Sequence, residues 1–514
     1  MSILFLYALI IISLTYIQRK NIGNGIFRTA KKVPWWISGV SLYMLYLSAE
    51  QGQLLTGIIA QHGMQGMWMV WASCLGAFVV PMVFAPLWQK LDFITDNQFL
   101  LFRFPGKSGK ALHLFRAIYV GGLVVALLIC FHILGFSRVI QTYFELDPTT
   151  SILITGAVLC LFALKNIFDI KLKMDILHFA LYLIGTCVIL YSVYVVNNGG
   201  DAFLSFFERH PEKKQLFPNS NNTSDWFSLI VFIGIQWWSC TLFDGGGPEM
   251  ARFTATKDKK NSIRSGLFPI VISIIMGFFL VGQILLLLGT SPELVNGEIL
   301  YVEGIFKIVP ESLKSIVLLG FFGMFITTAE SLMNWGASFL TIDAYKTYVQ
   351  PNASDKNIRA ASFATMLLLS LFSTFFALQI DSLQSLMKIT FSIAAGVAPV
   401  YILRWVWFRI NAWSQISAMI SSAVCTLIYP TVHAYLPLKD LPMEESRVLV
   451  VTAITTVIWL IITYATPNQS ETVKLKMMPI IENRGMLLRQ FLFALALGFL
   501  LLFLSSGVWY FFLY

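Results

Sequence analysis

The stretch Ser48-Ala49-Glu50-Gln51-Gly52-Gln53 decides how the chain is organised. It interrupts an apolar run, residues 36–60, that is long enough to cross a bilayer. An acid and two amides at that depth are costly unless backbone groups or a bound ion need them. A helix that stops hydrogen-bonding itself inside a membrane is tolerated where it lines a cavity, and its freed carbonyls can then hold a cation. The stretch therefore predicts an interrupted membrane helix with a bound ion or solute.

Composition supports a membrane protein. Of the 514 residues, 57% are hydrophobic and 12% are charged, which is too apolar for a soluble globule. The net charge of +9 is scattered through short loops rather than gathered in one patch, so no nucleic-acid partner is predicted. The lipid bilayer is the partner that composition predicts.

Fourteen apolar segments follow one another along the chain. We place them at residues 2–17, 36–61, 66–88, 114–139, 150–166, 174–197, 226–243, 265–289, 315–345, 360–380, 383–408, 414–436, 447–466 and 487–512. The segments predict an all-α polytopic protein with about 14 transmembrane helices.

A second interruption follows the first by five segments. After residues 226–243 the chain reads Phe243-Asp244-Gly245-Gly246-Gly247-Pro248-Glu249, which cannot continue a stable helix. Interrupted helices in matching positions of two five-helix halves are typical of inverted-repeat transporters. The alternative is that these glycines simply end a helix at a loop.

Basic residues predict the orientation. With the N-terminus outside, the cytoplasmic loops hold 27 Lys and Arg against 8 in the external loops. Because positive charge favours the cytoplasmic side, we expect both termini outside a cell (inner) membrane.

Several separate motifs resemble the sodium:solute symporter family, which includes the sodium-galactose, proline and sialic acid carriers. The motifs are Pro34-Trp35-Trp36, Ser48-Ala49-Glu50-Gln51, the run from Asn334 through Thr341-Ile342-Asp343-Ala344-Tyr345, and Trp407-Phe408-Arg409-Ile410-Asn411. The resemblance implies a leucine-transporter-like five-plus-five inverted repeat. Residues 1–35 would be an extra helix and loop, residues 36–409 the ten-helix core with repeats at about 36–197 and 226–408, and residues 410–514 three additional helices.

The resemblance also implies a sodium ion as co-substrate. Carried over by motif, its ligands would be the carbonyls of Met44, Leu47 and Met324 and the hydroxyls of Thr327 and Thr328. Sodium is a hard cation, so neutral oxygens suit it. The alternative for the two threonines is that their hydroxyls bond back to carbonyls of their own helix.

A second ion site is implied at Asp175, Glu330 and Ser331, where Glu330 departs from the small hydroxyl residue usual in the family. Two carboxylates facing one cavity could hold a cation, or could share a proton because like charges raise one pKa. The alternative is structural, with Asp175 paired to Lys173.

The solute wall implied by the resemblance combines aromatic surface with a few polar groups. Its members would be Gln51, Trp71, Ser73, Trp237, Trp238 and Ser239. Such a wall favours a small polar solute, in the first place a sugar or sugar derivative, and an amino acid or a carboxylate is the alternative. The same aromatic residues are also typical of ordinary helix packing.

The sequence thus predicts a sodium-coupled symporter that works by alternating access, with a proton-coupled carrier as the alternative. A membrane enzyme is the rival class, but the six histidines lack the spacing of paired metal ligands and no nucleophile elbow or phosphate loop is present. The oligomeric state is left open.

Overall fold

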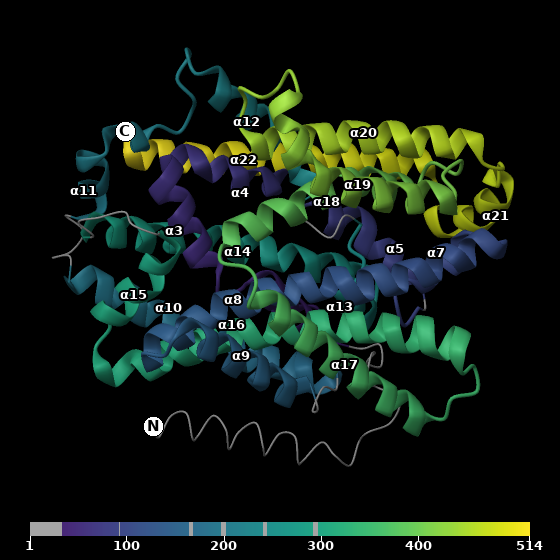
Figure 1. The fold of residues 1–514 in the computed structure, drawn as a ribbon, viewed down its shortest axis with the longest axis horizontal. Coiled ribbons are helices and arrows are strands. Elements are labelled where there is room, and N and C mark those ends of the chain that lie inside the picture. The colour runs from purple at the N-terminus through teal and green to yellow at the C-terminus, as the bar shows by residue number, and fades with distance from the viewer. Residues whose placement is uncertain (1–32, 92, 164–167, 197–201, 240–243, 291–296) are drawn as a thin grey trace. The chain divides into compact units, whose positions relative to one another are not determined.

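The computed structural model describes residues 33–514 except 92, 164–167, 197–201, 240–243 and 291–296 (Figure 1). Regular structure in these residues is helical, apart from one isolated bridge between Val33 and Thr256. The chain divides into two compact units, each assembled from three separate stretches of sequence. A helix that crosses a boundary between the units belongs to the unit that holds most of its residues.

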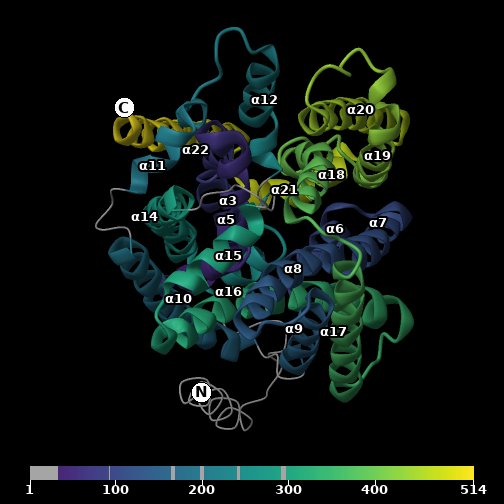
Figure 2. The ribbon, with the colours of Figure 1, turned by 60° about the vertical axis from the view of Figure 1, so that its left-hand side comes forward.

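Unit 1 comprises Met1–Gly63, Ala117–Lys213 and Ala255–Leu383. In it α2 packs against α14. In the same unit α10 packs along α16, and α8 packs against α9, α16 and α17 (Figures 1 and 2). Its elements are α2 (Trp35–Tyr46), α3 (Gln51–His62), η5 (Tyr119–Val124), α8 (Val125–Phe144), α9 (Pro148–Ala163), α10 (Phe168–Val196), α11 (Ala202–Arg209), η6 (Pro211–Lys214), α14 (Lys259–Thr290), α15 (Gly297–Ile308), α16 (Glu311–Ser338), η8 (Phe339–Val349) and α17 (Asp355–Ala377).

Unit 2 comprises Met64–Arg116, Lys214–Thr254 and Gln384–Tyr514. In it α19 packs along α20, and α22 packs against η3 and η4. Its elements are η2 (Gly63–Met67), α4 (Trp68–Trp71), η3 (Ala72–Leu75), η4 (Val80–Phe84), α5 (Ala85–Lys90), α6 (Gln98–Arg103), α7 (Gly106–Ile118), α12 (Thr223–Gly234), η7 (Gln236–Trp238), α13 (Pro248–Ala255), α18 (Leu383–Leu403), α19 (Ala412–Val432), η9 (His433–Tyr435), α20 (Met443–Ala465), α21 (Ser470–Ile481) and α22 (Arg484–Leu513).

Local sequence explains where several of these helices begin. The Asn411 side chain accepts hydrogen bonds from the first turn of α19 and Ser414 bonds back to the Asn411 backbone, which forms a capping box. The side chains of Ser354 and Asn483 accept backbone hydrogen bonds at the starts of α17 and α22 in the same way. These polar residues therefore mark where loops give way to apolar helices.

The apolar segments predicted from the sequence correspond to helices. In the part of the chain that the structure describes, ten helices are long and apolar enough to cross a membrane, and two shorter apolar helices accompany them at Pro148–Phe162 and Thr223–Gly234. The segment predicted at 36–61 is divided into α2 and α3, and the segment predicted at 2–17 lies outside the described residues. The prediction of an all-α polytopic membrane protein is confirmed.

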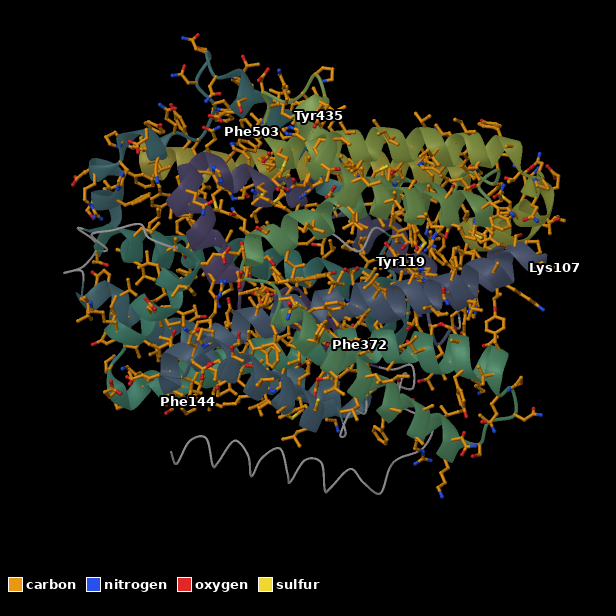
Figure 3. The ribbon with its side chains drawn as sticks, in the orientation of Figure 1. Lys107, Tyr119, Phe144, Phe372, Tyr435 and Phe503 are labelled. Atoms are coloured by element: carbon orange, nitrogen blue, oxygen red, sulfur yellow. The ribbon has the colours of Figure 1, made fainter. Side chains whose placement is uncertain are left out.

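Large apolar side chains cover the outer faces of several helices. Phe372 on α17 is 56% exposed and Phe503 on α22 is 75% exposed (Figure 3). A soluble surface rarely displays rows of such side chains, whereas lipid tails accept them without cost. These faces are where the bilayer contacts the protein.

Both predicted interruptions are present. Four residues, 47–50, separate α2 from α3, and α12 ends at Gly234 well before α13 begins at Pro248. Gly245 and Gly247 have φ angles of 69° and 62°, a region that favours glycine. The three-glycine run therefore makes a turn that a helix of L-residues could not make. The assignment of two inverted repeats stays a prediction.

Candidate functional site

The first interruption lies in unit 1 and exposes backbone carbonyls. Leu47 is extended, with φ −87° and ψ 130°, so helix α2 ends at Tyr46 and the next helical turn starts only at Gln51. Because the chain turns away here, the carbonyls at the end of α2 are not all used within the helix. Such carbonyls are available to a hydroxyl, a water molecule or an ion.

The hydroxyl of Thr328 on α16 lies among three of these backbone oxygens. Its Oγ1 is 3.1 Å from the Met44 carbonyl, 2.9 Å from the Leu47 carbonyl and 3.2 Å from the Met324 carbonyl. Thr328 is 3% exposed. A hydroxyl has one proton, so it can donate to only one of the three carbonyls at a time, and the other two carbonyls keep the capacity to bind another group. Four neutral oxygens converging in this way suit a hard monovalent cation.

Thr327, the neighbouring residue, faces a different set of groups. Its Oγ1 lies 2.8 Å from His178 Nδ1 on α10, and its carbonyl accepts a 2.7 Å hydrogen bond from the Ser331 hydroxyl. The structure thus brings Thr328 to the Met44 and Leu47 carbonyls, and directs the Thr327 side chain toward α10. The role of Thr327 as an ion ligand stays a prediction.

A second polar cluster joins α2, α10 and α16 next to the Thr328 site. The Lys171 ammonium on α10 donates to the Thr327 carbonyl at 2.7 Å and lies 3.4 Å from Asp175 Oδ1 and 3.9 Å from Glu330 Oε2. The Asp175 carboxylate also accepts a hydrogen bond from the Ser41 hydroxyl. The predicted group of Asp175, Glu330 and Ser331 is therefore brought together, and it already contains a cationic side chain.

Sequence reading missed Lys171. Lys173 was the expected partner of Asp175 in the structural alternative, but Lys173 is exposed. The Lys171 side chain is 2% exposed. The spacing of four residues between Lys171 and Asp175 puts both on one helix face, and that spacing was the signal that could have identified the pair.

Glu50 lies at the start of α3, fully buried. An acid at this depth could have bonded the backbone amides that the interruption exposes, but the Glu50 side chain forms no cap hydrogen bond at the start of α3. Instead Glu50 Oε1 lies 2.6 Å from His132 Nδ1 on α8. Gln53 completes the attachment by donating to the Gly135 carbonyl at 2.8 Å. The interruption is therefore held in place by α8.

A small, partly open pocket lies beside the interruption in unit 1. Gln51, one of the predicted solute residues, is among its polar lining residues. The polar lining residues are Ser48, Gln51, Tyr182, Thr186, Gln283 and Tyr301. Apolar side chains such as Met276, Leu280, Val317 and Phe321 form much of the remaining wall. A largely apolar wall with a few amide, hydroxyl and phenol groups suits a small polar organic molecule.

The other predicted solute residues lie in unit 2, where η3 packs against η7. Trp71 is buried with its ring 5.7 Å from that of Trp68, and the Trp237 and Trp238 rings are 5.4 Å apart. The Ser73 and Ser239 hydroxyls both donate to carbonyls three residues earlier in the chain, at 2.7 Å. In this conformation the two hydroxyls are used locally, and their role in solute binding stays a prediction.

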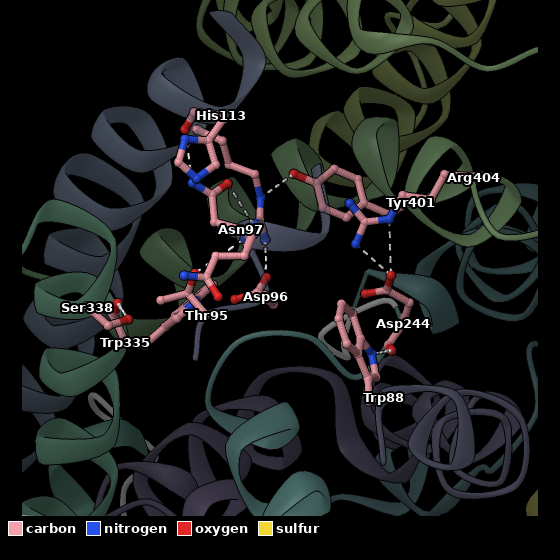
Figure 4. Close-up of polar contacts among 12 residues, drawn as sticks. Trp88, Thr95, Asp96, Asn97, His113, Asp244, Trp335, Ser338, Tyr401 and Arg404 are labelled. Atoms are coloured by element: carbon pink, nitrogen blue, oxygen red, sulfur yellow. Dashed lines mark hydrogen bonds and ion pairs between the residues drawn. The ribbon is translucent and has the colours of Figure 1, made fainter. Parts of the chain in front are cut away.

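The second interruption is held by a buried charged network in unit 2. Asp244 Oδ2 accepts a hydrogen bond from Arg404 at 2.7 Å, and the Asp244 carbonyl accepts one from Trp88 at 2.7 Å (Figure 4). Asp244 Oδ2 also accepts a hydrogen bond from the Trp405 indole at 2.6 Å. These contacts fix the residue that precedes the three glycines. Sequence reading identified the glycine run but not these partners, because they come from segments about 160 residues away.

An equivalent buried pair lies nearby in the same unit. Arg116 Nη2 lies 2.6 Å from Asp96 Oδ2, and Arg116 Nε donates to the Tyr401 hydroxyl at 2.9 Å (Figure 4). Both guanidinium groups are thus paired with a carboxylate, as buried charges require.

The chain is similar in sequence to known membrane transporters. The model of the family described as "Sodium:solute symporter family" matches residues 27–422. A sodium/glucose cotransporter of Vibrio parahaemolyticus is 19% identical over 453 residues, which cover 80% of this chain and 80% of that protein. Sodium/glucose cotransporter 1 of Oryctolagus cuniculus is 21% identical over 464 residues, which cover 80% of this chain and 68% of that protein.

Solved structures show the same fold. A Na⁺-coupled sialic acid symporter, in a substrate-bound outward-open state, superposes with a TM-score of 0.70 at 15% identity, covering 91% of this chain and 98% of the other. A nucleobase-cation-symport-1 family transporter, in a closed conformation with bromovinylhydantoin bound, gives a TM-score of 0.55 at 12% identity, covering 89% of this chain and 98% of the other. The predicted leucine-transporter-like fold is confirmed.

Proposed function

Because this chain belongs to the sodium:solute symporter family, we propose that it imports a sugar or sugar derivative by alternating access, together with sodium bound at Thr328. The family makes the chain a sodium-coupled, multi-pass membrane transporter of a small solute and not an enzyme. The solute class, the ion ligands and the direction of transport are the parts that we propose.

The convergence of Thr328 Oγ1 with the carbonyls of Met44, Leu47 and Met324 is the observation that carries the sodium site. A sodium ion among these oxygens would join the interruption between α2 and α3 to α16. The ion would stabilise the conformation in which these elements touch, and its loss would let them separate. Sodium binding on one side of the membrane and release on the other would then drive the change of access.

One sodium ion supplies enough energy for concentrative uptake. Crossing roughly 100 mV yields about 2.3 kcal/mol, and a tenfold concentration gradient adds about 1.4 kcal/mol. Together these terms support a solute gradient of roughly a few hundredfold. Active uptake is thus possible with the Thr328 site alone.

Two observations support a sugar-like solute. Both cotransporters that match the sequence are named for glucose, and the symporter whose structure matches carries sialic acid, a sugar acid. The cavity beside the interruption combines amide groups from Gln51 and Gln283 with the phenol rings of Tyr182 and Tyr301. Aromatic faces pack on the apolar face of a sugar ring, and amides bond its hydroxyls.

The charge distribution supports the orientation. With 27 Lys and Arg in alternate loops against 8 in the others, we place both termini outside the cell (inner) membrane. Labelling of residues near each terminus with a membrane-impermeant reagent added outside intact cells would test this orientation.

Uptake into liposomes by the purified chain tests the function. We would compare a panel of sugars, sialic acid, amino acids and carboxylates, with sodium or with choline outside. Saturable uptake of a sugar that requires sodium, and that in Thr328→Ala needs about ten to a hundredfold more sodium, is the expected result. Thr328→Ser keeps the hydroxyl and should stay close to the parent protein.

Other outcomes of that panel would contradict the proposal. Uptake of an amino acid or a carboxylate would reject the solute class while leaving sodium coupling intact. Uptake that follows a proton gradient and ignores sodium would reject the ion. Unchanged sodium dependence in Thr328→Ala would reject the site.

A further inference from the structure

The cluster beside the Thr328 site has the composition of a cation site, and its cation is a side chain of the protein. Asp175, Glu330 and the Thr327 carbonyl present oxygens to one position, and the Lys171 ammonium occupies it. We propose that Lys171 is a tethered substitute for a second sodium ion, so that this chain couples transport to one sodium. This inference rests on the proposed sodium-coupled function and specifies its stoichiometry.

Distances support this assignment of Lys171. Its Nζ is 2.7 Å from the Thr327 carbonyl, 3.4 Å from Asp175 Oδ1 and 3.9 Å from Glu330 Oε2. The side chains of Lys171 and Asp175 are 2% and 1% exposed, and that of Glu330 is 13% exposed. An ammonium is buried so completely only where carboxylates and carbonyls replace its water shell.

Charge explains why the ammonium excludes sodium. Asp175 and Glu330 can together contribute two negative charges, and Lys171 contributes one positive charge. A sodium ion placed among the same oxygens would lie within a few ångströms of the ammonium, and like charges at that distance repel strongly away from water. The same oxygens therefore serve Lys171 or a sodium ion, and Lys171 is always present.

The tether also changes what this position does during transport. Lys171 lies on α10, Thr327 and Glu330 lie on α16, and the Ser41 hydroxyl of α2 donates to Asp175. A dissociable ion here would connect these three helices only while bound. A lysine connects them whatever the sodium concentration is, so the Thr328 site alone would respond to sodium.

Binding of radiolabelled sodium to the purified full-length chain in lipid nanodiscs tests the inference without knowledge of the solute. We expect one ion per chain in the parent protein, with a Hill coefficient near one. Lys171→Met should bind two ions per chain, because the oxygens of Asp175, Glu330 and the Thr327 carbonyl would then be released from the Lys171 ammonium. Lys173→Met, which removes an exposed lysine two residues away on the same helix, should still bind one ion.

A second variant covers the case in which Lys171→Met does not fold. Lys171→Met/Glu330→Gln removes one positive and one negative charge, so the net charge of the cluster is unchanged. We expect this variant also to bind two ions per chain, the second held by Asp175 and the neighbouring oxygens. Adding Asp175→Asn should return the count to one.

The outcomes separate this inference from the proposed function. Two ions per chain in the parent protein would overturn it, as would a count that stays the same in both Lys171 variants. If Thr328→Ala leaves the parent ion count unchanged, the proposed sodium site fails. A gain of one ion on removing Lys171 would still support the inference in that case.

Discussion

Gly135 lies where α8 passes the interruption between α2 and α3. A methyl group added at Gly135 would clash with Glu50. A Cβ at Gly135 would be 2.3 Å from Glu50 Cβ and 3.1 Å from Glu50 Cα. Carbon atoms in contact stay about 3.5–4.0 Å apart, so α8 and the interruption would have to separate by more than about 1 Å. We therefore predict that Gly135→Ala disturbs the geometry of the sodium site.

The size of the effect follows from three terms. Ala in place of Gly in a helix interior contributes about 1 kcal/mol of stability. Overpacking a fitted contact costs about 1–3 kcal/mol, and loss of the hydrogen bond from Gln53 to the Gly135 carbonyl costs about 1 kcal/mol. The sum predicts a net loss of about 2 kcal/mol, together with weaker sodium binding because Leu47 is only three residues from Glu50.

A matched variant isolates the collision. Gly277 lies in the interior of α14, and a Cβ there would meet no atom within 4 Å. Gly277→Ala should gain only the higher helix propensity of alanine, because no steric clash opposes it. The variant should be as stable as the parent protein or slightly more stable. Thermal unfolding in detergent and the sodium concentration for half-maximal binding would be measured for both. If Gly135→Ala is as stable as Gly277→Ala and binds sodium normally, the predicted clash with Glu50 does not occur.

Three further changes have predicted outcomes. His132→Ala leaves the buried Glu50 carboxylate without its imidazole neighbour and should cost about 2 kcal/mol in chemical unfolding; a loss below about 1 kcal/mol would contradict the pairing. Asp244→Asn leaves the buried Arg404 guanidinium without its carboxylate and should lower thermal stability by about 3 kcal/mol or more, whereas Asp244→Glu should lower it less. Asp258 accepts a hydrogen bond from the first turn of α14 that holds the pKa of its carboxyl below the usual range, so its stabilisation is present at neutral pH and is lost as pH falls through that lowered pKa. Asp258→Asn should remove this acid-dependent part of the unfolding profile, and an unchanged profile would show that other carboxyl groups account for it.

The membrane fold and the positions of the interruptions can be predicted from the amino-acid sequence. Apolar runs of membrane length can form only helices in a bilayer, and an acid with two amides at 48–53, or three glycines at 245–247, ends such a helix locally. The motifs also selected Thr328 together with the carbonyls of Met44 and Leu47, and the structure brings these groups together. These features depend on neighbouring residues or on motifs that relatives share.

The pairing of the buried polar groups follows from the packing of the helices. Glu50 and His132 are 82 residues apart, and Asp244 and Arg404 are 160 residues apart. No local pattern specifies such partners, because the pairing follows from which helix faces pack together. Lys171 combines both cases, because its spacing of four residues from Asp175 is visible in the sequence, whereas its contact with the Thr327 carbonyl depends on the packing of α10 against α16. A buried charge must find a partner within a few ångströms, and the fold decides which partner is within reach.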